Sequence, residues 1–217
     1  VTNGIALDSV AMSASLAFGP ALAGILIKTT GFAGGYVAIF IAYSVGLMLV
    51  WKLKIGLRKR NDVDGKGTMK DLFLGLRYVS GHRTIVAIVL ITVLMNLLLF
   101  SHSHMVPVIA REVLAVGPLL MGVLAAAAGF GSMVGAVIVA SATKIRYPGR
   151  LFLGGSLLAL IFLFLFSMSG QYLISILLLL VLGFGASGFS TTQGTMVMLI
   201  ADEEMRGKAL GVVSLAI

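Results

Sequence analysis

Long apolar runs alternate with short polar turns along the chain. An apolar run of about 20 residues is long enough to cross a bilayer as a helix. Such runs lie at residues 8–28, 34–52, 84–105, 118–142, 151–168 and 172–200, and a seventh begins near residue 207. The run Leu173–Phe184 is apolar on every side, whereas a membrane β-strand alternates in polarity. The pattern therefore predicts an all-α, polytopic transmembrane helical bundle with six spans and the start of a seventh.

One long polar segment, Lys52–Arg83, separates the second and third runs. Its first part, residues 58–68, reads as a flexible linker. From Met69 on, apolar residues recur at helical spacing, at Leu72, Phe73, Leu76 and Val79, with Lys70, Asp71 and Arg77 off that stripe. This spacing predicts an amphipathic helix that lies at the membrane surface. An ordinary solvated linker helix is the alternative.

The composition supports a lipid environment. Hydrophobic residues make up 59% of the 217 residues and charged residues only 11%, against about 25% charged in an average soluble domain. So few charges cannot cover a globule of this size, and the net charge of +8 therefore indicates membrane topology and not a nucleic-acid partner. Cysteine is absent, which excludes disulfides, thiolate metal sites and a thiol nucleophile.

The basic residues predict the orientation in the membrane. Nine Lys and Arg lie in the segment 52–83, three in the turn 144–150 and two in the turn 202–208, whereas the opposite side has only Lys28 and Arg111. Basic turns face the cytoplasm, so we expect the central segment 53–83 to be cytoplasmic. The chain starts at Val1 and stops at Ile217 inside an apolar run, and we expect it to be part of a longer protein.

The stretch SLAFGPALAGIL, residues 15–26, places a proline inside the first run. Proline normally ends a helix, but neighbouring helices and hydroxyls can satisfy the freed carbonyl in a membrane bundle. The small residues Gly19, Ala21, Ala23 and Gly24 leave room for a second helix to approach. We therefore expect Pro20 to bend this span and not to end it.

Three local patterns resemble motifs of the major facilitator superfamily. Gly19–Gly24 is similar to the G-P-x-x-G-G core of the fifth-helix motif of its exporters. The family motif has two earlier glycines, and Ala6 and Ser15 stand at those positions in this sequence. Gly149 and Arg150 match the second cytoplasmic latch, where Arg146 replaces an Asp, and Arg206 and Gly207 match the turn before the eleventh helix. Longer segments are similar to bacterial exporters of siderophores, macrolides and other drugs.

The resemblance implies a domain organisation and a function. Residues 1–52 would be the last two helices of the N-terminal half, residues 53–83 the central linker, and residues 84–217 the first four helices of the C-terminal half with the start of a fifth. It implies a monomeric secondary transporter of the bacterial inner membrane, without cofactor or enzymatic activity. It would export a hydrophobic or siderophore-like small molecule by alternating access, coupled to protons. An uptake facilitator, a membrane scaffold and an intramembrane enzyme are the alternatives.

Polar side chains midway along the spans are the candidate substrate contacts, because such transporters bind substrate near the midplane. They are Tyr43, Asn96, Ser187, Thr192 and Gln193. Asn96 could instead hydrogen-bond another helix, and the hydroxyls could bond their own helix. No Asp, Glu, Lys or Arg lies midway along a span. A coupling carboxylate would then lie elsewhere in the protein, or at Asp8 or Glu112, and the lining favours a neutral or lipophilic substrate.

The fourth run is rich in small residues four apart, the pairs being Gly122 and Ala126, Ala125 and Gly129, and Gly131 and Gly135. This spacing lets helix backbones approach closely in lipid, either for static packing or as a surface that slides during transport. His102 and His104 could suggest a metal. On a helix they point about 200° apart, so we expect no metal site and place them at the outer end of the third span.

Overall fold

The structure is a computed structural model that describes residues 2–52, 67–141 and 147–216. The described residues form helices and no strands, so the predicted all-α class is confirmed. The helices are α1 (Thr2–Lys52), α2 (Gly67–Gly81), α3 (Arg83–Met95), η1 (Asn96–Phe100), α4 (His102–Val108), η2 (Ile109–Val113), α5 (Pro118–Ser141), α6 (Pro148–Ser167), α7 (Tyr172–Ile200) and α8 (Arg206–Leu215). Residues 58–66 of the predicted flexible linker, Arg146, and the side chains of Ala6 and Asp8 lie outside the described part. Gly67 and Thr68, the last two residues of that linker, instead begin α2.

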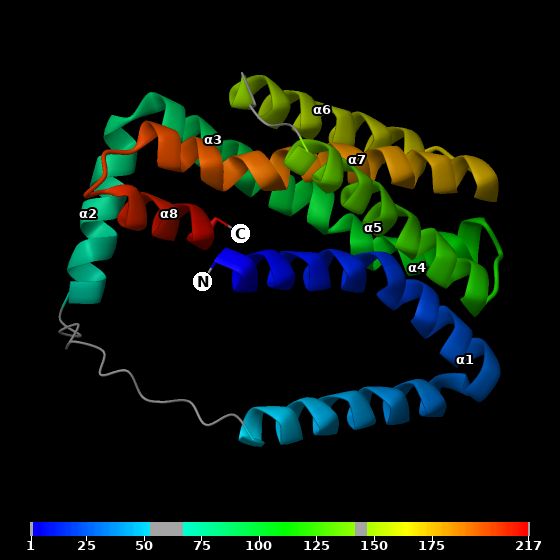
Figure 1. Cartoon of the computed structure of the whole chain (residues 1–217). Coiled ribbons are helices and arrows are strands. Elements are labelled where there is room, and N and C mark those ends of the chain that lie inside the picture. Colours follow the sequence, from blue (N-terminus) through cyan, green and yellow to red (C-terminus); the bar gives the residue numbers. More distant parts are fainter. Residues whose placement is uncertain (1, 53–66, 142–146, 217) are drawn as a thin grey trace.

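Helix α1 contains both of the first two predicted spans. Gly31 breaks it with φ 71° and ψ −175°, in a region that glycine enters without a Cβ penalty. Figure 1 shows α1 turning back on itself at its middle, so residues 2–30 form a first arm and residues 32–52 a second arm. Because the two spans form one broken helix, five and not six separate helices of the described chain are long and apolar enough to cross a membrane.

The third predicted span is longer than expected. The helical path through α3, η1, α4 and η2 runs over 31 residues, from Arg83 to Val113, so the predicted end at residue 105 is wrong. Pro107 lies inside α4 and the path continues beyond it as the π-helical η2. The π-helical hydrogen bonding of η2 accommodates Pro107, which has no backbone N–H to donate to the preceding turn. His102 and His104 therefore lie within a continuing helix and not at its end.

Helix α5 lies between the first arm of α1 and α7, and α7 also packs along α6. The α6–α7 contact includes the rings of Phe152 and Phe189, with centroids 5.3 Å apart. Many large apolar side chains on the outside are exposed, among them Leu157, Phe164 and Leu177. An apolar exterior around a packed interior is the arrangement expected of a bundle surrounded by lipid.

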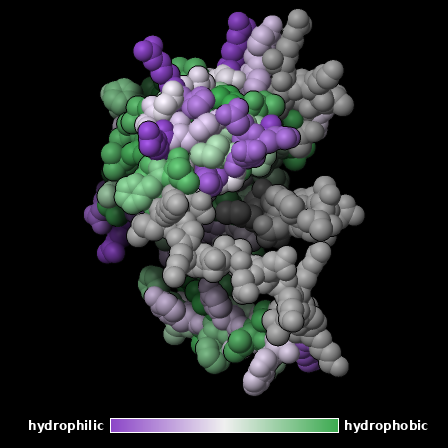
Figure 2. Space-filling view, turned by 90° about the vertical axis from the view of Figure 1, so that its left-hand side faces the viewer, coloured by the Kyte–Doolittle hydropathy of each residue, from purple (hydrophilic) through white to green (hydrophobic). Residues whose placement is uncertain are grey.

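The turns alternate between two ends of the bundle (Figure 1). Helix α2 crosses the end that also holds the α7–α8 turn, and hydrophilic side chains gather at this end (Figure 2). The predicted stripe on α2 divides: Val79 is buried and Leu72 is half-buried, whereas Phe73 and Leu76 are exposed. Gly75, outside the predicted stripe, is buried as well. The helix thus packs one face on α8 and leaves an apolar face outward.

Candidate functional site

The first arm of α1 meets α5 at backbone distance. A Cβ atom on Gly24 would lie 2.7 Å from the Pro118 oxygen and 3.0 Å from Gly122 Cα. About two helical turns further along α5, a Cβ on Gly129 would lie closer still to Leu16 and would also meet the buried Ala17. Both contacts admit only glycine, because any side chain would collide with the backbone of the other helix. We call this contact the α1–α5 seam.

Two carbonyl groups of α1, those of Leu16 and Pro20, face α5 in the seam. Proline has no N–H to donate to the carbonyl four residues earlier, which belongs to Leu16. The Leu16 oxygen lies against Gly129 and the Pro20 oxygen against Gly122. Glycine Cα–H groups are weak donors to carbonyl oxygens at helix interfaces. The freed Leu16 carbonyl therefore lies against the backbone of the neighbouring helix, and the path of α1 continues past Pro20, as expected.

The other face of α5 meets α7 in the same way. A Cβ on Gly131 would overlap Leu180, one on Gly135 would overlap Ser187, and one on Gly183 would overlap Ala128. The small residues of α5 thus divide between two partners. Gly122 and Gly129 serve the seam with α1, whereas Gly131 and Gly135 serve α7. Whether these surfaces slide during transport stays a prediction.

Two of the five predicted substrate contacts meet at Thr92. The Gln193 Nε2 on α7 donates to Thr92 Oγ1 at 2.6 Å, and Asn96 Nδ2 donates to the Thr92 carbonyl at 3.0 Å. Thr92 Oγ1 in turn donates to the Ile88 carbonyl at 2.8 Å. Gln193 and Thr92 are both buried. Asn96 thus bonds its own helix, and the link between helices is made by Gln193.

The other predicted contacts do not join this cluster. The hydroxyls of Ser187 and Thr192 donate to carbonyls of their own helix, at Phe184 and Gly188. Tyr43 lies on the second arm of α1 with 79% of its surface exposed. Thr92 was missed by the sequence reasoning, because a threonine in an apolar run resembles any other helix-bonded hydroxyl. A role for any of the five in substrate binding stays a prediction.

A cavity of about 290 Å³ lies where the first arm of α1, α4, α5 and α7 come together. Its walls are mostly small and apolar, with Pro20, Gly129 and Gly183 among them. The polar side chains in the lining are His102, Ser103 and Ser132. The sequence placed His102 at a helix end, whereas in the structure it lies within the helical path that continues to Val113 and lines the cavity. We call this space the central cavity.

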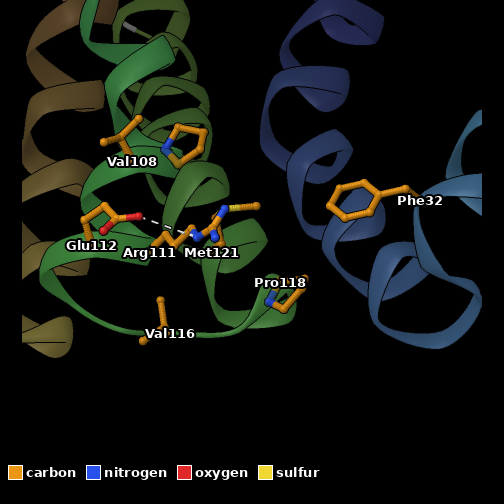
Figure 3. A pocket seen from close by; sticks show the side chains of 8 residues that line it. Phe32, Val108, Arg111, Glu112, Val116, Pro118 and Met121 are labelled. Carbon is orange, nitrogen blue, oxygen red and sulfur yellow. Dashed lines mark ion pairs between the residues drawn. The ribbon is translucent and has the colours of Figure 1, made fainter.

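A second hollow, of about 540 Å³, opens near the other end of the seam. Figure 3 shows Phe32 of α1 on one side and Pro118, Arg111 and Glu112 on the other. Arg111 Nε pairs with Glu112 Oε1 at 3.5 Å, and both side chains are largely exposed. Glu112, a predicted candidate for a coupling carboxylate, therefore lies in an exposed ion pair.

The arrangement of long apolar helices, close glycine contacts and a cavity between them is typical of transporters. The family model of the Major Facilitator Superfamily matches residues 1–217, the full length of the chain. The chain belongs to the major facilitator superfamily. No curated protein and no solved structure matches it. As a member of this superfamily it is a multi-pass membrane transporter, and a small-molecule substrate follows from that assignment.

The predicted superfamily turn motifs lie at the end where α2 crosses the bundle. Arg206 Nε donates to the Ala201 carbonyl at 3.2 Å, and its guanidinium pairs with Glu203 at 3.6 Å. The Arg150 guanidinium lies 4.6 Å from the centre of the Tyr147 ring. A Cβ on Gly149 would be 3.6 Å from Met196, whereas Gly19 and Gly207 face open space. Two residues of the fifth-helix motif, Pro20 and Gly24, lie in the α1–α5 seam.

The described residues hold no group of three or more His, Asp or Glu side chains that could bind a metal ion.

Two hydrogen bonds connect α2 to the α7–α8 turn. Tyr78 Oη of α2 donates to Asp202 Oδ2 at 3.0 Å and accepts from the Asp202 N–H at 3.0 Å. These hydrogen bonds connect α2 to the turn before α8. The sequence did not predict this contact, because the two residues lie 124 positions apart.

Proposed function

We propose that the intact protein exports a hydrophobic or siderophore-like small molecule by alternating access, driven by protons. The observation that carries this is the central cavity beside the α1–α5 seam. Residues 1–52 would belong to the N-terminal half and residues 84–217 to the C-terminal half, so the cavity would lie between the halves. Substrates of such transporters bind between the repeats.

The lining of the cavity supports the substrate class. Its walls are mostly apolar, and the polar members His102, Ser103 and Ser132 offer few hydrogen bonds. A densely charged substrate would lose its hydration there without gaining opposite charges. An uncharged or weakly polar molecule is therefore favoured. Asn96, Gln193, Thr192, Ser187 and Tyr43 remain the proposed polar contacts along its path.

Export as the direction is supported by the likeness of Gly19–Gly24 to the exporter motif. We further propose that the protein is a monomer in a bacterial inner membrane with residues 53–83 in the cytoplasm. The alternation of the turns between two ends of the bundle supports this orientation. Helix α2 and the starts of α6 and α8, which carry described basic residues of the central segment and of the two basic turns, lie at one end, in keeping with the positive-inside rule.

The test uses everted membrane vesicles from cells that produce the full-length protein. With an acidic lumen, we expect the vesicles to accumulate radiolabelled chloramphenicol, an uncharged aromatic amide, and to accumulate the cation ethidium less. An uptake facilitator would empty preloaded vesicles under the same gradient, and that result would contradict export. Asn96→Ala and Gln193→Ala should each lose accumulation at unchanged abundance. Normal accumulation by both variants would show that the proposed contacts are wrong.

A further inference from the structure

His102 is the ionisable side chain of the central cavity. It is the first residue of α4, two positions after the end of the π-helical η1, and is half-buried. It lines the cavity with Ser132 of α5 and Pro20 of α1. A π-helical turn within a span frequently marks a functional site. Neither the seam nor the hydrogen bonds around Thr92 account for a histidine at this position.

The contact of the ring with its own helix favours one tautomer. His102 Nδ1 faces the Leu99 carbonyl oxygen, and because a carbonyl oxygen only accepts, this contact favours the tautomer with the proton on Nδ1. In the neutral ring the proton-accepting nitrogen is therefore Nε2. Histidine is also the side chain whose ordinary pKa allows it to gain and lose a proton near neutral pH. The ring can thus take up a proton at Nε2 without giving up its bond to Leu99.

The described residues that line the cavity offer no charge to pair with an imidazolium. The lining from α1 is Leu16 and Pro20, and that from α5 and α7 is alanine, glycine, leucine and Ser132. Within the described lining, His102 alone is ionisable. On its own helical path, Arg111 and Glu112 pair with each other at the exposed end. An imidazolium in this cavity therefore depends on water for its stability.

We propose that His102 is the proton carrier of the transport cycle and that its proton competes with an uncharged lipophilic molecule for the central cavity. The proposal rests on the exporter function proposed above. When the cavity is open to the outside, Nε2 takes a proton from water. When it faces the cytoplasm, the entering molecule displaces water, and the unpaired imidazolium releases that proton to the cytoplasm. One proton moves inward for each molecule that moves outward.

The test compares His102→Asn with wild type in the everted vesicles. Asparagine keeps a hydrogen-bonding group but cannot carry the proton. We expect this variant to lose the gradient-driven accumulation of chloramphenicol. In the wild type, exchange of one proton per molecule limits the ratio of chloramphenicol inside to outside to about tenfold per pH unit. Downhill equilibration without a gradient should remain in the variant. The matched control is His104→Asn, since His104 is two residues away on the same helix and exposed. It should accumulate chloramphenicol as wild type does.

Undiminished accumulation by His102→Asn would overturn the proton-carrier role while leaving export intact. A wild-type protein that does not accumulate chloramphenicol would overturn the proposed function itself, so the two failures are distinguishable. A measurement on the wild-type protein decides the matter even if the variant does not insert. Chloramphenicol at about ten times its Kd should slow the carbethoxylation of His102 about tenfold. The reaction at His104 should be unaffected. Equal rates at His102 with and without chloramphenicol would overturn the proposal.

Discussion

Thr92 joins two helices through one hydroxyl group. Its Oγ1 accepts from Gln193 and donates to the Ile88 carbonyl, and its own carbonyl accepts from Asn96. In an apolar interior, removing one partner leaves the other polar group unsatisfied. At the scale of single residues, the hydrogen bond between α3 and α7 therefore joins the Gln193 amide to this hydroxyl, and the sequence singled out only the amide.

We expect Thr92→Val to destabilise the full-length protein in detergent by about 1 kcal/mol, the scale of hydrogen bonds between membrane helices. The measurement is unfolding in increasing SDS. In a double-mutant cycle, adding Gln193→Leu should cost little more, because the amide that needed the hydroxyl is gone. Thr195→Val is the control, since the Thr195 hydroxyl bonds only the Thr191 carbonyl of its own helix. Additive losses in the cycle would contradict the link.

The element that governs close approach is the α1–α5 seam. Gly24 faces Gly122, and Gly129 faces Ala17, with no room for a side chain between them. Such a contact holds the two helices together by close packing and not by hydrogen-bonding side chains. We therefore expect the closed seam to tolerate no larger side chain.

Gly24→Leu should block efflux of chloramphenicol while the protein still inserts in the membrane. A Cβ at this position would already lie 2.7 Å from a backbone oxygen, and overpacking of this kind costs about 1–3 kcal/mol. The measurements are efflux and membrane abundance. Gly46→Leu is the control, because a side chain at Gly46 meets nothing within 4 Å. Normal efflux by Gly24→Leu would show that the seam does not have to close.

Helix α2 is an element held by one side chain at a distant turn. Tyr78→Phe removes both hydrogen bonds to Asp202, each contributing about 1 kcal/mol. We expect faster amide hydrogen exchange over residues 72–81 and no change in α5. The control is Tyr36→Phe, whose ring is exposed on the second arm of α1. Unchanged exchange in α2 after Tyr78→Phe would show that packing on α8 alone holds the helix.

At the scale of the molecule, the turns alternate between two ends, and this predicts which residues a membrane-impermeant maleimide reaches. These 217 residues contain no cysteine, so each introduced thiol gives a clean signal. In intact cells we expect Gly117→Cys to be labelled and Glu204→Cys to be labelled only after the membrane is opened. The two positions lie in turns at opposite ends of the bundle. The reverse result would overturn the proposed orientation.

The sequence by itself determined the environment and the elements. Apolar runs in lipid must satisfy every backbone group internally, so length and hydropathy alone predict helices. The bounds of α5 and α7 differ from the predicted runs by at most one residue. The end at Val113 was missed because Pro107, Arg111 and Glu112 resemble a turn, and because π-helical hydrogen bonding is not encoded in hydropathy.

Only the tertiary structure decided which face of each helix meets which partner. A helix that is apolar on every side has no amphipathic stripe, so its sequence does not record the direction of its neighbours. That is why Gly122 and Gly131, both in one small-residue run, face different helices. For the same reason, the sequence did not indicate that Thr92 accepts a hydrogen bond from another helix or that His102 lines a cavity.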